Sequence, residues 1–295
     1  MRTVRRMAAG AVAAALVTIA AAGGRGEAAT TKKATRHGPL AGLPSGPGPT
    51  IEKIKALGDN EWVDLGPPAA DPTWGRALGR SWSPKMGYAP DLRGAFLAGE
   101  GGHGWVNPRT KRQMDDLWVY DIKAHRWTKV KTIWTNNFTP QPDIPKPPQG
   151  GDVIACYDAK RDRIYMARNK RLWFYDVQAN TWVDPKPTGE FDAQATHDGL
   201  MNYDVANDRV VIITLGETSS PPGHKVFVYD PEANTCIATA AAVPKGIAQM
   251  NGFYHPVLNV HFVHAATDNR EGVMWAYRYR RGTRATPPTE RRPGP

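Results

Sequence analysis

The residue types best suited to ligand chemistry begin with the glycine-rich stretch at 101–105, which carries His103 and Trp105. An indole ring can stack on the apolar face of a ligand, and an imidazole can donate or accept a hydrogen bond beside it. This pairing predicts a polar and aromatic platform for a sugar or a peptide. A glycine-rich turn with a solvated histidine is the alternative for the same residues.

A second candidate is acidic. Asp152 lies five residues before Tyr157, and Asp198 lies five residues before Tyr203 with His197 next to it. Carboxylates at the same level of two repeated segments can bind a cation or act as an acid and a base. Carboxylates that cap strand ends or line a water-filled channel would show the same spacing, so both interpretations stay open.

A third candidate is Trp134, which precedes a proline-rich stretch at 140–148. Proline-rich chain is stiff and extended, so this loop could present the tryptophan to a partner or act as a plain spacer.

Known enzyme and metal motifs are missing from the sequence. His261 and His264 are three residues apart, which places them on opposite faces of a strand and excludes them as a metal pair. The sequence contains no Cys-x-x-Cys, His-Glu-x-x-His or Gly-x-Ser-x-Gly pattern. We therefore predict no metal and no cofactor, and the residues leave enzymatic activity undecided.

A repeated aromatic phrase supplies the elements that must position these residues. Asp116–Asp121 contains Leu-Trp-Val-Tyr-Asp, and similar phrases occupy 172–176 and 226–230. Seven residues after the tyrosine stand Trp127, Trp182 and Cys236 in turn. Each copy predicts a strand, a tight turn built on Asp or Asn, and a second strand.

Each phrase closes a unit that opens with another short strand ending in tyrosine, at Tyr88, Tyr157, Tyr203 and Tyr254. Successive openings are 69, 46 and 51 residues apart, and propeller repeats run about 40–50 residues with insertions. Four antiparallel strands bury both faces only when units stack around an axis. The sequence therefore predicts an all-β propeller with four blades.

With Gly99-Glu100-Gly101-Gly102 before an insertion and the Tyr-Asp…Trp phrase after it, the pattern resembles the kelch-repeat (galactose-oxidase-like) β-propeller family over roughly residues 80–280. The double glycine occurs only in the first unit. The resemblance implies a β-propeller with its ligand on the face of the long loops. It also implies either a binding module or a sugar-active enzyme of the epimerase or oxidase type.

The fourth unit lacks a recognisable last strand, whereas Trp62–Leu65 looks like a strand without a unit. We predict that this N-terminal strand near 62–65 completes the last blade. A truncated chain or an open arc is the alternative.

The two ends of the chain differ from the repeats. Arg2, Arg5 and Arg6 precede an apolar run from Met7 to Ala22, which predicts a signal peptide at 1–28 and a secreted or periplasmic protein. The run is too short for a stable membrane span, which needs about 20 residues, although an uncleaved anchor stays possible. Residues 29–59 are predicted to be a flexible linker with a short helix near 51–57, residues 60–281 the propeller, and residues 282–295 a disordered Pro/Arg-rich tail.

The net charge of +10 also belongs to the ends. Residues 1–60 carry +6 and residues 278–295 carry +5, which leaves −1 for the repeats. A nucleic-acid-binding surface needs a basic stripe across the fold, so nucleic acid is excluded as a partner. Cys156 and Cys236 fall on strands of neighbouring blades, too far apart for a disulfide, and are expected to be buried thiols.

The sequence thus favours an exported propeller that binds a protein or a glycan through its long-loop face. An enzyme with its site at the channel mouth near Asp152, His197 and Asp198, or a fragment of a larger propeller, are the alternatives.

Overall fold

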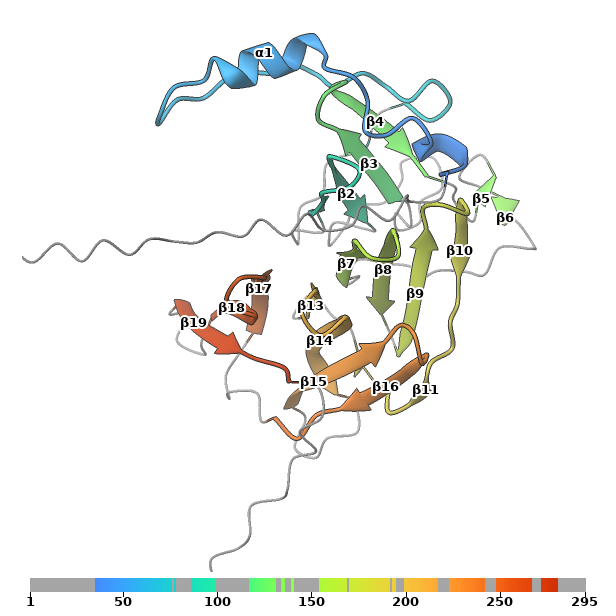
Figure 1. Cartoon of the computed structure of the whole chain (residues 1–295), viewed down its shortest axis with the longest axis vertical. Coiled ribbons are helices and arrows are strands. Elements are labelled where there is room, and N and C mark those ends of the chain that lie inside the picture. The colour runs from blue at the N-terminus through green and yellow to red at the C-terminus, as the bar shows by residue number, and fades with distance from the viewer. Residues whose placement is uncertain are drawn as a thin grey trace, which may run out of the picture. The chain divides into compact units, whose positions relative to one another are not determined.

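A computed structural model describes residues 35–75, 77, 86–98, 117–130, 134–135, 139–140, 154–168, 170–191, 193–194, 199–216, 223–241, 248–266 and 272–280. Most of these residues belong to antiparallel strands, which form the four blades of a β-propeller (Figure 1). The predicted all-β fold and its blade number are confirmed.

Blades 1 and 2 are four-stranded meanders. Blade 1 contains β1 (Met86–Ala89), β2 (Gly94–Ala98), β3 (Leu117–Asp121) and β4 (Arg126–Lys129). Blade 2 contains β7 (Ile154–Asp158), β8 (Arg163–Arg168), β9 (Arg171–Asp176) and β10 (Thr181–Val183). A separate two-stranded pair, β5 (Trp134–Thr135) and β6 (Thr139–Pro140), lies between them in sequence.

Blade 3 contains β13 (Leu200–Asp204), β14 (Arg209–Gly216), β15 (Gly223–Asp230) and β16 (Thr235–Ala238). Two short strands extend it: β11 (Thr188–Gly189) pairs parallel to β16, and β12 (Ala193–Gln194) pairs with β14. Blade 4 has three strands within the described residues: β17 (Ala248–His255), β18 (Val260–Ala266) and β19 (Gly272–Tyr277).

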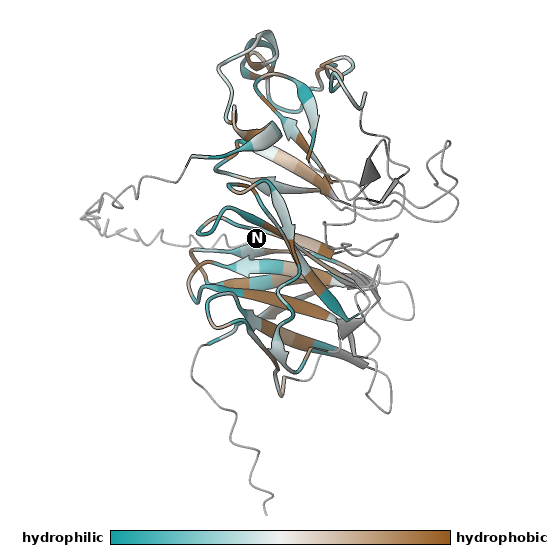
Figure 2. Ribbon diagram, turned by 90° about the vertical axis from the view of Figure 1, so that its right-hand side faces the viewer, coloured by the Kyte–Doolittle hydropathy of each residue, from teal (hydrophilic) through white to brown (hydrophobic). Residues whose placement is uncertain are grey.

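The innermost strands of successive blades are neighbours: β1 contacts β7, β7 contacts β13, and β13 contacts β17. An apolar cluster fills each of the three spaces between these blades. Phe96 and Ile164 belong to the first cluster, Tyr165 and Phe227 to the second, and Val211 and Val263 to the third. Each fully buried aliphatic or aromatic side chain contributes about 1.5–3 kcal/mol relative to an exposed one, so these clusters hold the blades together. Figure 2 shows that hydrophobic residues are concentrated on the strands of the blades.

One hydrogen bond recurs in the hairpins of every blade. A tyrosine near the end of the first strand bonds through its hydroxyl to the side chain five residues later, and that second residue has a positive φ. The pairs are Tyr120–His125, Tyr157–Asp162, Tyr175–Asn180, Tyr203–Asp208, Tyr229–Asn234 and Tyr254–Asn259. Asn and Asp tolerate the left-handed backbone conformation better than most residues. In five of these six turns the tyrosine and an Asn or Asp residue therefore define the turn together, and His125 takes the second role in the remaining one.

The aspartate after the tyrosine completes the turn. Asp158 Oδ1 accepts the backbone N–H groups of Lys160 and Arg161, and Asp176 Oδ1 accepts those of Gln178 and Ala179. These bonds explain why the Tyr-Asp phrase recurs in the sequence: the aspartate accepts the backbone N–H groups of the turn, and the tyrosine hydroxyl holds the side chain of the residue with positive φ.

The predicted closure of the last blade by residues 62–65 is wrong. These residues form no strand, and Trp62 is 99% exposed. The chain instead follows the outer edge of blade 1, where Ala69 exchanges backbone hydrogen bonds with His125 and Trp127 beside β4. The carboxylate of Asp71 fixes this course because it accepts the amides of Thr73, Trp74 and Lys129.

The segment before it also packs on the blades. The expected short helix is α1 (Pro49–Lys55), preceded by a 3-10 helix η1 (Gly38–Leu40). Leu40 is fully buried in the apolar cluster of blades 1 and 2, and the guanidinium of Arg36 pairs with Asp162 at 2.6 Å.

Candidate functional site

Most of the predicted site residues lie outside the part of the chain that the structure describes: His103, Trp105, Asp152, His197 and Asp198. Trp134 lies in β5, where its backbone pairs with Pro140, but its side chain is not among the described groups. The functional roles predicted for these six residues therefore stay predictions.

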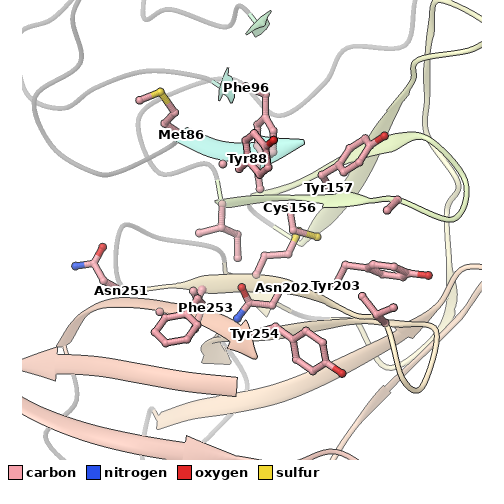
Figure 3. Close-up of a pocket in the computed structure, with 18 of the residues that line it drawn as sticks. Met86, Tyr88, Phe96, Cys156, Tyr157, Asn202, Tyr203, Asn251, Phe253 and Tyr254 are labelled. Carbon is pink, nitrogen blue, oxygen red and sulfur yellow. The ribbon is translucent and has the colours of Figure 1, made fainter. Parts of the chain in front are cut away.

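The described residues enclose a cavity of about 730 Å³ along the innermost strands of all four blades (Figure 3). One end of its wall is formed by Met86, Ile154, Gly199 and Met250. The other end is formed by residues of the following turns, Pro90, Ala159, Val205 and Pro256. The cavity thus runs the length of the inner strands, and its volume falls in the range of about 300–1,000 Å³ that small-molecule and cofactor sites occupy.

No charged side chain is among the described residues that line this cavity. Its wall consists of glycine, alanine, proline, aliphatic, methionine and aromatic residues, together with one cysteine and two asparagines. Chemistry at this wall therefore depends on neutral groups: tyrosine hydroxyls, one thiol and two carboxamides.

Three of the tyrosine hydroxyls are already engaged. Tyr157 donates to Asp162 at 2.6 Å, Tyr203 donates to Asp208 at 2.8 Å, and Tyr254 donates to Asn259 at 3.0 Å. Figure 3 shows these three hydroxyls pointing toward the turns, whereas Met86 and Asn251 lie at the opposite end of the cavity. These tyrosines therefore present their rings to the cavity, and their hydroxyls are bound in the turns.

The pKa values agree with this assignment. Burial, and next the hydrogen bond to Asp162, raises the pKa of Tyr157 far above its usual range. Burial, followed by the charge of Asp158, does the same for the pKa of Tyr203. Since both phenols stay protonated at neutral pH, neither can act as a base there.

The thiol in the cavity wall is also neutral. Cys156 is buried, and burial raises its pKa well above the ordinary value of 9.0, with a smaller contribution from Asp158. The thiolate is the nucleophilic form of cysteine, so this residue is not an activated nucleophile. As expected, Cys156 and Cys236 are buried free thiols.

The two carboxamides in the described wall belong to Asn202 on β13 and Asn251 on β17. A carboxamide offers both donors and acceptors. The two side chains are half-buried and exposed respectively, so both can exchange hydrogen bonds with water or with a ligand.

The two outer walls of the cavity, on blades 1 and 4, expose apolar side chains. Met86, Tyr88 and Phe253 retain 56%, 58% and 54% of their accessible surface. The ring of Phe253 stacks on Phe262, its partner across β17 and β18, with 5.3 Å between centroids. Exposed apolar groups gathered around a hollow are typical of a binding site.

Charged residues gather at the turns instead, where they join the blades. Arg161 of blade 2 makes two hydrogen bonds to Asp208 of blade 3, at 2.6 and 2.8 Å, and Lys160 reaches the same carboxylate at 2.5 Å. The hydrogen bonds from Arg161 are the main reason that the pKa of Asp208 lies far below its usual range. In this cluster the positive charges of blade 2 are paired with the carboxylate of blade 3, and the ion pairs connect the two blades.

Metal and membrane signatures are missing from the same residues. Within the described ranges, no group of three or more His, Cys, Asp or Glu side chains could hold a metal ion. No helix there has the length and apolar character to cross a membrane. Comparison with known proteins adds nothing to the assignment, because neither a family model nor a curated protein matches this chain.

None of the residues that line the cavity was among the site residues predicted from the sequence. The sequence nevertheless marks part of the wall by position. The residue before the tyrosine of the first strand lines the cavity in all four blades: Gly87, Cys156, Asn202 and Phe253. Their types differ from blade to blade, so only their common register identifies them.

Proposed function

We propose that this chain is a non-catalytic binding propeller whose ligand occupies the central cavity. The observation that carries the proposal is the chemistry of the described wall: apolar and aromatic surfaces with two carboxamides and, among its described residues, no carboxylate, imidazole, ammonium or guanidinium group. Ligand sites are mostly apolar, with a few polar groups that orient the ligand.

The ligand class follows from the same wall. A charged ligand would lose its hydration without meeting an opposite charge, which is costly in an apolar environment. An uncharged group with an apolar face suits the rings of Tyr88 and Phe253, while Asn202 and Asn251 can bond its polar atoms. Both a neutral glycan and a protein loop with apolar side chains meet this description.

We also propose that the protein is exported and that its propeller is of the kelch type. Arg2, Arg5 and Arg6 before an apolar run support a signal peptide and a secreted or periplasmic protein. The Tyr-Asp…Trp phrases on propeller strands support the kelch resemblance. On this basis we also propose that the long-loop face extends the binding surface beyond the cavity.

A sugar-active enzyme is the competing function. It would need an acid and a base at the channel mouth. The described wall has no carboxylate or imidazole, three of its tyrosine hydroxyls are engaged in the turns, and its thiol is neutral. Binding therefore fits the described geometry better than catalysis does.

A screen of the mature protein against neutral glycans and against extracellular protein fractions tests this function. We expect saturable binding without any change in the bound glycan, measured by mass spectrometry of the recovered ligand. Turnover of a sugar acid or oxidation of a sugar by the pure protein would overturn the proposal in favour of the enzyme.

A further inference from the structure

The ring of Tyr88 differs in burial from the tyrosines at the same position of the other inner strands. Tyr157 and Tyr203 are each only 7% exposed, and Tyr254 is half-buried. Tyr88 instead keeps 58% of its accessible surface. Since all four residues line the central cavity, Tyr88 is the one whose ring is least covered by the protein itself.

The hydroxyl of Tyr88 differs as well. In blades 2, 3 and 4 the corresponding hydroxyl is bound to an Asp or Asn side chain five residues later. Five residues after Tyr88 stands Arg93, which shares the positive φ of its counterparts, but a guanidinium offers no acceptor. Within the described residues the Tyr88 hydroxyl makes no hydrogen bond, so it is available to a ligand.

Two more uncovered apolar side chains complete this side of the cavity. Met86 lies two residues before Tyr88 on β1, so both side chains project from the same face of the strand. Phe253 belongs to β17 of blade 4. Figure 3 shows Met86 and Tyr88 on one side of the cavity and Phe253 on the opposite side. A thioether and two aromatic rings, each more than half exposed, thus face a bound molecule here.

This set of groups favours an aromatic ring over a sugar ring. Aromatic rings attract one another in offset or edge-to-face arrangements, and a methionine sulfur makes favourable contacts with them. A sugar ring carries a hydroxyl on most of its carbons, and each hydroxyl that is buried without a partner costs free energy. The hydroxyl and carboxamide groups of the described wall that are not engaged in the turns belong to Tyr88, Asn202 and Asn251. An aromatic ring with one polar substituent needs only one of these groups.

We propose that Tyr88 determines which ligand the cavity accepts, and that this ligand presents an aromatic ring that carries a polar atom. This inference rests on the proposed binding function of the cavity. The ligand ring packs against Tyr88 and Met86 from blade 1 and against Phe253 from blade 4, and its polar atom bonds to the Tyr88 hydroxyl. A free phenol and a tyrosine side chain of a peptide share this chemistry.

Ligand-detected NMR titrations of the full mature chain test the ring preference with N-acetyl-L-tyrosinamide, N-acetyl-L-leucinamide and maltose. We expect the tyrosine derivative to bind about three- to tenfold more tightly than the leucine derivative, and maltose not to bind. Tyr88→Leu should remove the preference. Met274→Ala is the matched control and should bind like wild type, because Met274 is also 58% exposed but lies on β19, outside the described wall.

Tyr88→Phe separates the hydroxyl from the ring. It should weaken binding of N-acetyl-L-tyrosinamide about three- to tenfold. Binding of N-acetyl-L-phenylalaninamide should stay unchanged, because that ring has no polar atom for the hydroxyl to bond. Equal weakening of both probes, or of neither, would overturn the role given to the hydroxyl.

Two further probes, p-cresol and a blocked Ala-Ala-Tyr-Ala-Ala peptide, distinguish the sources of the ring. Tighter binding of the peptide would assign the site to a protein partner, and tighter binding of p-cresol would assign it to a small molecule; both results support the inference. Binding of maltose in place of the aromatic probes, weakened by Tyr88→Leu, would overturn the inference but keep the cavity as the binding site. Aromatic probes whose affinity neither Tyr88→Leu nor Phe253→Leu changes would contradict the cavity as well, and failure of every aromatic probe to bind would overturn the inference.

Discussion

His261 and Asp204 face each other across the boundary of blades 3 and 4, with 3.5 Å between Nε2 and Oδ2 and both side chains fully buried. Burial acts to raise the pKa of Asp204, but the contacts with His261 and Asn207 outweigh it, so the pKa lies below its usual range. This contact supplements the apolar cluster that attaches blade 4 to blade 3.

Replacing His261 with phenylalanine should destabilise the protein by about 1–2 kcal/mol at pH 7, because the buried Asp204 loses its contact with His261 but keeps the hydrogen bonds from Asn207. His264→Phe is a matched control, since that histidine is exposed on the same strand. Urea unfolding of both variants measures the difference. Equal stability of the two variants would show that the buried contact is unimportant.

Asp208→Asn should weaken the junction of blades 2 and 3, because Arg161 and Lys160 lose the charge they bind. The folded-state pKa of Asp208 is depressed, so its stabilising contribution is present above the ordinary carboxyl pKa of 3.8 and is lost as the pH falls below it. We expect a loss of about 1–3 kcal/mol that is constant from pH 7 to about pH 5 and shrinks only as the pH falls through the ordinary carboxyl pKa of 3.8 toward the lower pKa of the folded state. A difference from wild type that is independent of pH would contradict the ion-pair explanation.

The recurrent turn bond can be tested one hydroxyl at a time. Tyr203→Phe removes the hydroxyl that donates to Asp208 and should cost about 0.5–1.5 kcal/mol. Tyr88 is the control, because the residue five positions later is Arg93, whose side chain has no acceptor. Chemical denaturation should therefore separate Tyr203→Phe from Tyr88→Phe by about that amount.

Cys156 should react slowly with iodoacetamide at pH 7–8, since burial keeps its pKa well above 9.0 and only the thiolate reacts rapidly. The rate should rise only in more alkaline solution, as followed by mass spectrometry of the alkylated peptide. Rapid alkylation at neutral pH would mean that the cavity wall holds an activated thiol, against a purely binding role.

The sequence predicted the blades because each hairpin is a local unit: the Tyr-Asp phrase specifies strand, turn and strand within about a dozen residues. The strand that closes the last blade was mispredicted, because closure depends on pairing between segments far apart in the sequence. Residues near Trp62 have a strand-like composition, yet the bonds of Ala69 and the carboxylate of Asp71 attach the segment that follows to blade 1. The cavity was not predicted for the same reason, since its wall combines residues from four repeats that share a register but no residue type.

The most direct test of the central claim uses the ligand found in the screen and isothermal titration calorimetry on Phe253→Ala. Phe253 lines the cavity and is exposed there, whereas the control Ile237 is equally apolar and 50% exposed but lies on β16, outside the cavity wall. We expect Phe253→Ala to weaken binding at least about tenfold, or 1.4 kcal/mol, and Ile237→Ala to bind like wild type. Unchanged affinity of Phe253→Ala, with the fold intact, would contradict the cavity as the binding site.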